Sequence, residues 1–361
     1  FDNLVLMKRG EIVFLGSLSD TGHFLETLEK PCPPGINLAD HLIESISTEG
    51  VDKETIKEFK VPIDLGSGSH KANFANMKDA KSVLFLIQVL FLRNMQQTIR
   101  NWQIFVMGMG ATIVMALLVG SGVWRDIGND QQAPALLPPA LFFTCVNQGV
   151  FAALQSVNSF PGERAIMLRE RQAGAYNTFA YFTAKTLTDM CVQIWQPVIF
   201  SCIIYPLFNL RPGADKFFIY MGFMILDTMS ATALATLVTC FAVTVELSTV
   251  FLSLFFEVCR LYGGFFTSPA QLAAPEYQAF KWLDAISYIK YAFVGVALNE
   301  LEDLEFTCPS DYNGTCIDSG NEVIEQRGYD QYTVSGCAGA LILYMVLCRL
   351  LGFIGLKLIK H

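Results

Sequence analysis

Residues 131–162 read QQAPALLPPALFFTCVNQGVFAALQSVNSFPG, and residues 163–171, ERAIMLRER, follow them directly. The first stretch has no charged side chain and exceeds the roughly 20 residues that an α-helix needs to cross a bilayer. Cationic side chains at the end of a span favour the cytoplasmic face of the membrane. We therefore expect a membrane span that ends in a charged cytosolic loop.

The composition of the whole chain is typical of an α-helical polytopic membrane protein. Of its 361 residues, 52% are hydrophobic and only 16% are charged, whereas soluble domains carry about 25% charged residues. The net charge of −8 argues against a nucleic-acid partner, because neutralising phosphates requires clustered Lys and Arg.

The sequence lacks the patterns of several enzyme classes. Its four histidines, His23, His41, His70 and His361, lie outside the predicted spans, which argues against a histidine-based metal or haem site in the membrane. The motifs GxSxG and HExxH do not occur, and neither does the Gly-Lys pair of a phosphate-binding P-loop. We expect no catalytic residue and no metal ligand in these residues.

Six segments are predicted to span the membrane. Trp102 and Trp124 bracket the first in the manner of an interfacial belt, the fourth contains Asp227, and the fifth contains Glu257 and Arg260. A helix over 77–100 precedes them, and its short apolar centre suits an interfacial position better than a span. The predicted spans are residues 102–124, 133–160, 186–210, 217–245, 247–266 and 332–356.

Residues 1–60 show a different pattern. Two β-rich runs, 4–7 and 12–15, flank a charged turn with Gly and predict a hairpin. A helix from Thr21 and a second helix capped by Asn37 follow. These elements are too few to bury a core, so we interpret them as the α/β remnant of a larger soluble domain.

A linker is expected between this remnant and the membrane domain. Residues 61–76 are rich in Gly and Ser, and the membrane domain covers 77–361. The chain opens on Phe1 without a basic n-region or a small-residue cleavage site, so we expect no signal peptide and a start inside a larger protein.

An even number of spans places both ends of the membrane domain on one side. Charge bias favours the cytosol for that side, because residues 163–171 hold three arginines and lysines close the chain. Residues 299–326 carry eight acidic side chains and no Lys or Arg, so a loop over 299–330 is free to be extracellular. We expect a multi-pass protein of the plasma membrane with both termini cytosolic.

The expected extracellular loop carries a modification signal. Asn313-Gly314-Thr315 is an N-glycosylation acceptor, and it lies between Cys308 and Cys316. We expect a glycan on Asn313 and a disulfide between the two cysteines. The alternative is two unpaired or intermolecular thiols.

Several segments resemble one protein family in their order and spacing. Residues 1–16, FDNLVLMKRGEIVFLG, resemble the segment that ends the nucleotide-binding domain of ABC transporters of the G subfamily. The membrane part resembles the half-transporters of that subfamily over nearly its whole length. The matching motifs are ER and RER within 163–171, GAY at 174–176, GGFF at 263–266 and ISYIKY at 286–291.

The resemblance implies a fold and a mode of action. The fold is the six-span, type-2 ABC exporter class, preceded by the remnant of a nucleotide-binding domain. The partner is a second half-transporter, identical or different, and ATP and Mg are bound by the missing N-terminal part of the parent protein. The expected substrate is an amphipathic molecule, such as a lipid, sterol or hydrophobic xenobiotic, moved across the membrane by alternating access.

Two other functions stay open at this point. The first is an ion-coupled carrier or channel that uses Asp227, Glu257 and Arg260 as a charge relay. The second is a membrane scaffold that transports nothing.

The resemblance also assigns roles to charged residues after the second span. Residues 77–100 match a connecting helix, and 163–176 match a coupling helix that rests on the nucleotide-binding domain. The candidate contacts are Glu163, Arg164, Arg169, Glu170 and Arg171. From the residues alone they form an ordinary positive-inside loop, which is the competing interpretation.

The resemblance places a substrate cavity at the dimer axis, with an external plug at Phe265 and Phe266. Asn and Gln there could instead join interhelical hydrogen bonds, and Phe side chains could face lipid. Drug-exporting relatives have apolar residues at the positions of Glu257 and Arg260. The two residues are three positions apart on one helical face, so their charges can neutralise one another. Their role is either functional or that of a structural ion pair. The cavity candidates are Asn147, Gln148, Phe151, Phe256, Glu257 and Arg260.

Overall fold

The computed structural model describes residues 4–8, 11–33, 37–47, 82–128, 130–172, 175–242, 244–307 and 317–358. The chain divides into two compact units, residues 1–80 and 81–361.

The first unit is an antiparallel hairpin packed on two helices. The expectation that these elements are too few to bury a core is wrong: buried side chains from both strands and both helices form one small core, in which the rings of Phe14 and Phe24 lie 4.9 Å apart. Asn37 caps the second helix, because its Oδ1 accepts a hydrogen bond from the Ala39 N–H at 3.0 Å. The predicted hairpin, helices and cap are therefore confirmed. The elements are β1 (Leu4–Lys8), β2 (Glu11–Gly16), η1 (Leu18–Asp20), α1 (Thr21–Thr27) and α2 (Leu38–Ser47).

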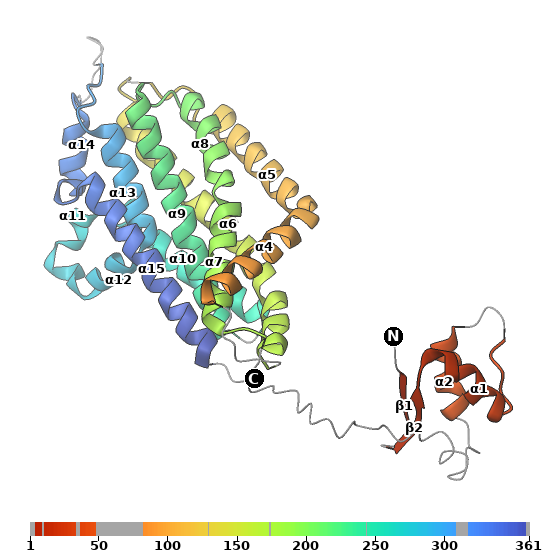
Figure 1. Ribbon diagram of the computed structural model, residues 1–361. Helices are drawn as coiled ribbons and strands as arrows, with labels where there is room; N and C mark the ends of the chain where they lie inside the picture. Colours follow the sequence, from red (N-terminus) through yellow and green to blue (C-terminus); the bar gives the residue numbers. More distant parts are fainter. Residues whose placement is uncertain are drawn as a thin grey trace. The chain divides into compact units, whose positions relative to one another are not determined.

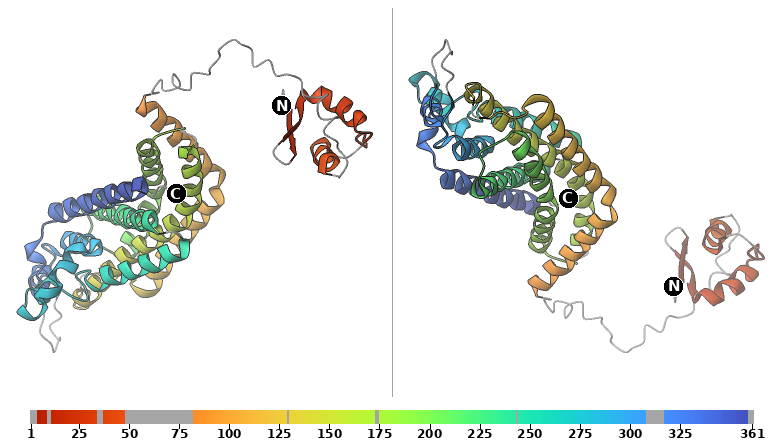
Figure 2. Two further views of the ribbon diagram at one scale, coloured as in Figure 1. Left: turned by 90° about the horizontal axis from the view of Figure 1, so that it is seen from below. Right: turned by 90° about the horizontal axis from the view of Figure 1, so that it is seen from above.

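The second unit is a bundle of helices, shown in Figure 1. The helices α9 and α15 lie side by side along much of their length in Figures 1 and 2. The elements are α4 (Val83–Arg100), α5 (Trp102–Leu117) with a π-helical continuation η3 (Leu118–Val123), α6 (Ala133–Gln172), α7 (Thr178–Gln193), α8 (Trp195–Leu207), α9 (Ala214–Phe241), α10 (Val245–Leu261), α11 (Pro269–Leu272), η4 (Pro275–Phe280), α12 (Lys281–Ile286), α13 (Tyr288–Leu301), α14 (Gly320–Arg327), η5 (Tyr329–Gln331) and α15 (Val334–Leu358).

Within the described residues, five helical stretches are long and apolar enough to cross a membrane. They are Phe105–Val123, Ala133–Asn158, Thr178–Leu207, Ala214–Phe241 and Val334–Leu358, and each overlaps a predicted span. The third starts at Thr178 instead of Thr186, because α7 and α8 continue through Ile194 as one 30-residue stretch.

The second span does not end in a loop. α6 is a single helix of 40 residues that runs through the whole charged segment to Gln172. The expectation of a charged loop at 163–171 is corrected here: Glu, Arg, Ala, Met and Leu are strong helix formers, and most of that segment consists of them.

The helix α10, which corresponds to the predicted fifth span, is shorter than expected. It has 17 residues, ends at Leu261 instead of Phe266, and is not among the five stretches above. Gly264 follows three residues after the helix end with a φ of +84°, a left-handed conformation that favours glycine. Short helices then lead to Ser287, whose hydroxyl donates to the Cys259 carbonyl at 2.7 Å, so the chain has turned back beside α10.

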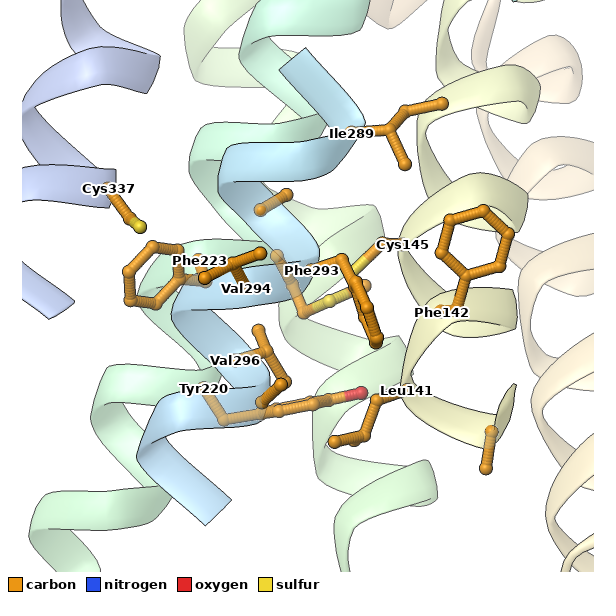
Figure 3. Close-up of a cluster of buried hydrophobic side chains, with 14 of the residues drawn as sticks. Leu141, Phe142, Cys145, Tyr220, Phe223, Ile289, Phe293, Val294, Val296 and Cys337 are labelled. Atoms are coloured by element: carbon orange, nitrogen blue, oxygen red, sulfur yellow. The ribbon is translucent and has the colours of Figure 1, made fainter. Parts of the chain in front are cut away.

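The helix α13 fills the centre of the second unit, and the sequence pattern did not predict it. All of its 14 residues except Tyr291 are buried, against α6, α9, α10 and α15. Figure 3 shows Phe293 and Val294 of α13 among side chains that include Phe142 and Phe223. A helix of this length reaches only about 21 Å, short of the about 30 Å of a bilayer core, so α13 is a buried re-entrant helix and not a span.

The residues around Ile317 and the charged segment of α6 lie at opposite ends of the bundle. Just before α6, the Gln131 Nε2 donates to the Ile317 carbonyl at 3.2 Å, whereas Glu170 near the other end of α6 contacts Arg93 of α4. The two points are about 58 Å apart along the helix axis. Ile317 follows residues 308–316, so this flank lies at the opposite end of the bundle from the charged segment of α6.

The modification sites proposed for that loop, Cys308, Asn313 and Cys316, lie outside the described residues. The disulfide and the glycan therefore stay predictions.

The packing of α13 on α9 predicts a sensitive glycine. A Cβ on Gly295 would lie 2.3 Å from the buried ring of Phe223, whereas a Cβ on Gly222 of α9 would meet no atom within 4 Å. We expect Gly295→Ala to lower stability by about 1–3 kcal/mol through overpacking, and Gly222→Ala to leave it unchanged or slightly raised. Thermal unfolding of the purified chain in lipid nanodiscs measures both, and equal melting temperatures for the two variants would contradict the described packing.

Candidate functional site

Two regions of the second unit bring the predicted residues together. The first is the elbow, defined as Arg164–Gln172 of α6 together with Tyr176. The second is a pocket between α6, α10 and α13.

Glu170 anchors the elbow to α4. The Arg93 Nη1 lies 2.9 Å from both carboxylate oxygens of Glu170, and the Tyr176 hydroxyl donates to Glu170 Oε2 at 2.5 Å. The ring of Tyr176 stacks on Tyr181 of α7 at 5.8 Å, which extends the contact to a third helix. The carboxylate therefore joins α4, α6 and the start of α7.

The charge state of Glu170 follows from these partners. Partial burial alone would raise its pKa, but the hydrogen bonds from Tyr176 and Arg93 and the positive charge of Arg93 together hold the pKa of Glu170 below its usual range. The same neighbourhood raises the pKa of Tyr176, through burial and the adjacent carboxylate. Glu170 is thus ionised and Tyr176 neutral at physiological pH.

Two arginines of the elbow hold the ends of other helices. The Arg164 Nη1 donates to the carbonyl oxygens of Thr239 and Ala242, at the C-terminal end of α9, at 3.3 and 2.8 Å. The Arg171 Nη1 donates to the Leu356 carbonyl in the last turn of α15 at 3.4 Å. Helix C-termini present unpaired carbonyls and a partial negative charge, so a guanidinium stabilises them.

The five residues predicted to couple therefore differ in their surroundings. Glu170 contacts α4, and Arg164 and Arg171 bind helix ends. Arg169 is exposed, and the side chain of Glu163 lies outside what the structure describes. Arg93 was missed as a site residue, because its partner is 77 positions away in the sequence.

The pocket contains most of the predicted cavity residues. Its volume is 290 Å³, and α6, α10 and α13 line it. Gln148 is the exception: it is 3% exposed and does not line the pocket. The lining residues are Phe143, Val146, Asn147, Val150, Phe151, Ser253, Phe256, Glu257, Arg260 and Ile289.

Glu257 and Arg260 form an ion pair at this pocket. The Arg260 Nη2 donates to Glu257 Oε2 at 2.5 Å across one turn of α10, and the side chains are 57% and 46% exposed. Within the described residues each charge thus has the other as its partner, as their spacing predicted. The exposure shows that the pair lies on the open side of the pocket.

The predicted plug residues form an aromatic cluster next to the pocket. The ring of Phe142 stacks on Phe265 at 5.1 Å and meets Phe266 edge-on at 5.6 Å. The cluster is held by the segment after α13, because the Tyr329 hydroxyl donates to the Gly264 carbonyl at 2.9 Å and the Arg327 guanidinium lies 5.3 Å from the Phe265 ring.

Several buried polar residues were not predicted as site residues. Lys290 of α13 donates to Asp284 at 2.6 Å, with both side chains almost fully buried. Glu300, near the other end of α13, accepts hydrogen bonds from the Arg211 N–H and the Asn299 side chain at 3.1 and 3.3 Å. Glu300 belonged to the expected external loop, but it lies within the last turn of a buried helix.

Comparisons with known proteins agree on one family. Residues 85–301 match the family model described as ABC-2 type transporter. Over 99% of its length the chain is 23% identical to "Protein white" of Ceratitis capitata, and over 91% it is 24% identical to "Broad substrate specificity ATP-binding cassette transporter ABCG2" of Sus scrofa. Over 76% it is 27% identical to "ABC transporter G family member 1" of Dictyostelium discoideum. The chain covers 55%, 56% and 35% of these proteins, so it spans about half their length or less.

The ion pair at the pocket predicts a charge-swap result. Glu257→Arg or Arg260→Glu alone leaves two like charges one turn apart at a membrane-facing pocket, and we expect each to cost about 1–3 kcal/mol of stability. The double swap restores opposite charges and should recover most of the loss. The melting temperature in lipid nanodiscs measures this recovery.

Glu246→Arg, at an exposed position in the first turn of the same helix, is the matched control and should have a smaller effect. A double swap no more stable than the single variants would show that the two charges do not support one another.

Proposed function

Since the chain belongs to the ABC-2 type transporter family, we propose that it is the membrane half of an ATP-driven exporter of the G subfamily. It is a multi-pass membrane protein whose relatives over most of its length are named as G-family or ATP-binding cassette transporters. In this proposal ATP and Mg²⁺ bind a nucleotide-binding domain outside the 361 residues, and the hairpin unit is the end of that domain. The energy of hydrolysis then drives alternating access in the bundle.

The observation that carries the proposal is the bonding of the elbow. Through Arg93, Arg164 and Arg171, this one segment is tied to α4 and to the C-terminal ends of α9 and α15. A displacement applied at the elbow would therefore act on several helices together. A surface loop that only satisfied the positive-inside rule would not need these contacts.

The pocket supports an amphipathic substrate. Phe143, Phe151 and Phe256 supply aromatic surface, whereas Asn147 and the Glu257–Arg260 pair supply polar groups. Pockets that bind small molecules combine apolar walls with a few polar groups in this way. A lipid, a sterol or a hydrophobic xenobiotic has matching chemistry, and membrane lipid surrounds the site.

A partner subunit fits the open side of the pocket. The outer face of α10 exposes large apolar side chains, and Glu257 and Arg260 are half exposed beside them. We propose that a second half-transporter, identical or different, packs against this face and completes the cavity. The exposed apolar side chains are Leu247, Val250, Phe251, Leu254 and Phe255.

The contact between Arg93 and Glu170 provides the test of this function. In the complete dimeric transporter in proteoliposomes, we expect Glu170→Gln to lower transport per ATP hydrolysed about tenfold, which corresponds to about 1.4 kcal/mol of coupling. Basal ATP hydrolysis should persist, because this contact lies in the membrane half. Tyr176→Phe, which keeps the ion pair, should have a smaller effect.

Two further variants make the test specific. Arg100→Gln removes an exposed arginine from the end of the same helix and should leave transport unchanged. The swap Arg93→Glu with Glu170→Arg should recover part of the coupling. Transport that continued after the ATPase domain was inactivated would instead identify an ion-coupled carrier, and normal coupling in Glu170→Gln would remove the elbow from the mechanism.

A further inference from the structure

The helix α9 shows how this bundle accommodates polar side chains. Thr228, Thr236 and Thr239 are buried, and each hydroxyl donates to a main-chain carbonyl four residues earlier, at 2.8, 2.8 and 2.9 Å. A hydroxyl group can do this because it carries a proton to donate. In a span, where no water replaces a missing partner, such internal bonds are required.

Asp227 of the same helix breaks this pattern. Its side chain is 0% exposed, and neither carboxylate oxygen has a hydrogen-bond partner among the described residues. An ionised carboxylate only accepts hydrogen bonds, so it cannot bond to the carbonyls of its own helix as the threonines do. An isolated buried carboxylate is also strongly disfavoured relative to its neutral form.

Tyr288 of α13 reaches the same point. Its side chain is also 0% exposed, and its hydroxyl also has no partner within the described part of the chain. A Cβ on Gly149 of α6 would lie 2.8 Å from the Tyr288 hydroxyl and 3.3 Å from Asp227 Oδ2. Three helices therefore meet at a glycine that leaves room for two polar groups.

Within the described part of the chain, the surroundings of Asp227 offer no positive charge. The titratable side chains near it are Tyr288 and, from α6, Cys145, with Tyr344 of α15 and Cys259 of α10 beside Tyr288. Lys290 is bonded to Asp284 instead. Among the described residues, no basic side chain is thus available to neutralise the carboxylate.

We propose that Asp227 and Tyr288 form a buried proton-binding site in which Asp227 is held as the neutral carboxylic acid. Binding forms one O–H bond on Asp227 and breaks one O–H bond of a hydronium ion at the membrane face, which is left as water. The acid then has a donor of its own, like the threonines of α9, and Tyr288 can bond to its other oxygen. A metal cation is a poorer ligand, because hard cations take about six oxygen ligands, whereas the unpaired side-chain oxygens described next to Gly149 are those of Asp227 and Tyr288.

The site has a consequence for transport, and this step rests on the proposed function. Asp227 lies where α6, α9 and α13 meet. If alternating access separates these helices and admits water, the acid loses its proton, so the equilibrium between the two conformations depends on pH. Asp227→Asn keeps a neutral side chain with the shape of the carboxylic acid, but this side chain can no longer release or bind the proton.

Infrared spectroscopy of the full chain in lipid nanodiscs at pH 7 tests the site without any assay of transport. We expect the spectrum of the wild type minus that of Asp227→Asn to contain the carbonyl band of a protonated carboxylic acid, with a shift in D₂O. Tyr288→Phe retains Asp227 and should move this band, because the proposed hydrogen bond from Tyr288 to the acid cannot form. If Asp227→Asn does not fold, this second variant still reports on the site.

Asp284→Asn is the matched control, because Asp284 is also buried but is paired with Lys290. Its difference spectrum should contain carboxylate bands instead. Loss of carboxylate bands in Asp227→Asn would overturn the proposal, and sensitivity of those bands to replacement of Na⁺ by choline would indicate a cation site.

In the complete transporter, we expect the pH dependence of transport to weaken in Asp227→Asn. An unchanged pH profile together with the acid band would retain the proton site and reject only its coupling to transport. Failure of the proposed transport function would leave the infrared result unaffected.

Discussion

Polar groups inside a bilayer must find their partners within the protein, because hydrocarbon offers none. The described part of the membrane unit meets this constraint in three ways. Buried threonines of α9 bond to their own helix, the buried Lys290 bonds to Asp284, and arginines of α6 bond to the last carbonyls of α9 and α15. Among the described buried carboxylates, Asp227 stands out because neither of its oxygens has a hydrogen-bond partner.

The same constraint explains how much of the fold could be predicted from the sequence. Long uncharged runs must be helical in a membrane, so six spans were predicted from the sequence, and five of them overlap the long apolar helices of the described residues. The hairpin and the Asn37 cap were predicted because their signals lie within a few residues. By contrast, α13 has only 14 residues and includes Lys290, so neither its length nor its charge marks it as the centre of a membrane bundle.

Only the part of the candidate site that depends on residues close in the sequence was predicted. Glu257 and Arg260 lie one turn apart, so their pairing follows from helical geometry. The contact of Glu170 with Arg93, and the bonds from Arg164 and Arg171 to other helices, join residues more than 70 positions apart. Such partners depend on the tertiary fold, and the sequence alone could only identify a cluster of arginines.

The helix α6 connects the two regions of the site. Asn147 and Phe151 line the pocket, and Glu170 lies further along the same unbroken helix, about 30 Å away along its axis. Because α6 also carries Gly149, the point at which Asp227 and Tyr288 meet belongs to this helix as well. A shift of α6 at the elbow would therefore change the pocket and the buried acid together, and a proton at Asp227 would in turn favour the arrangement in which α6, α9 and α13 are closely packed.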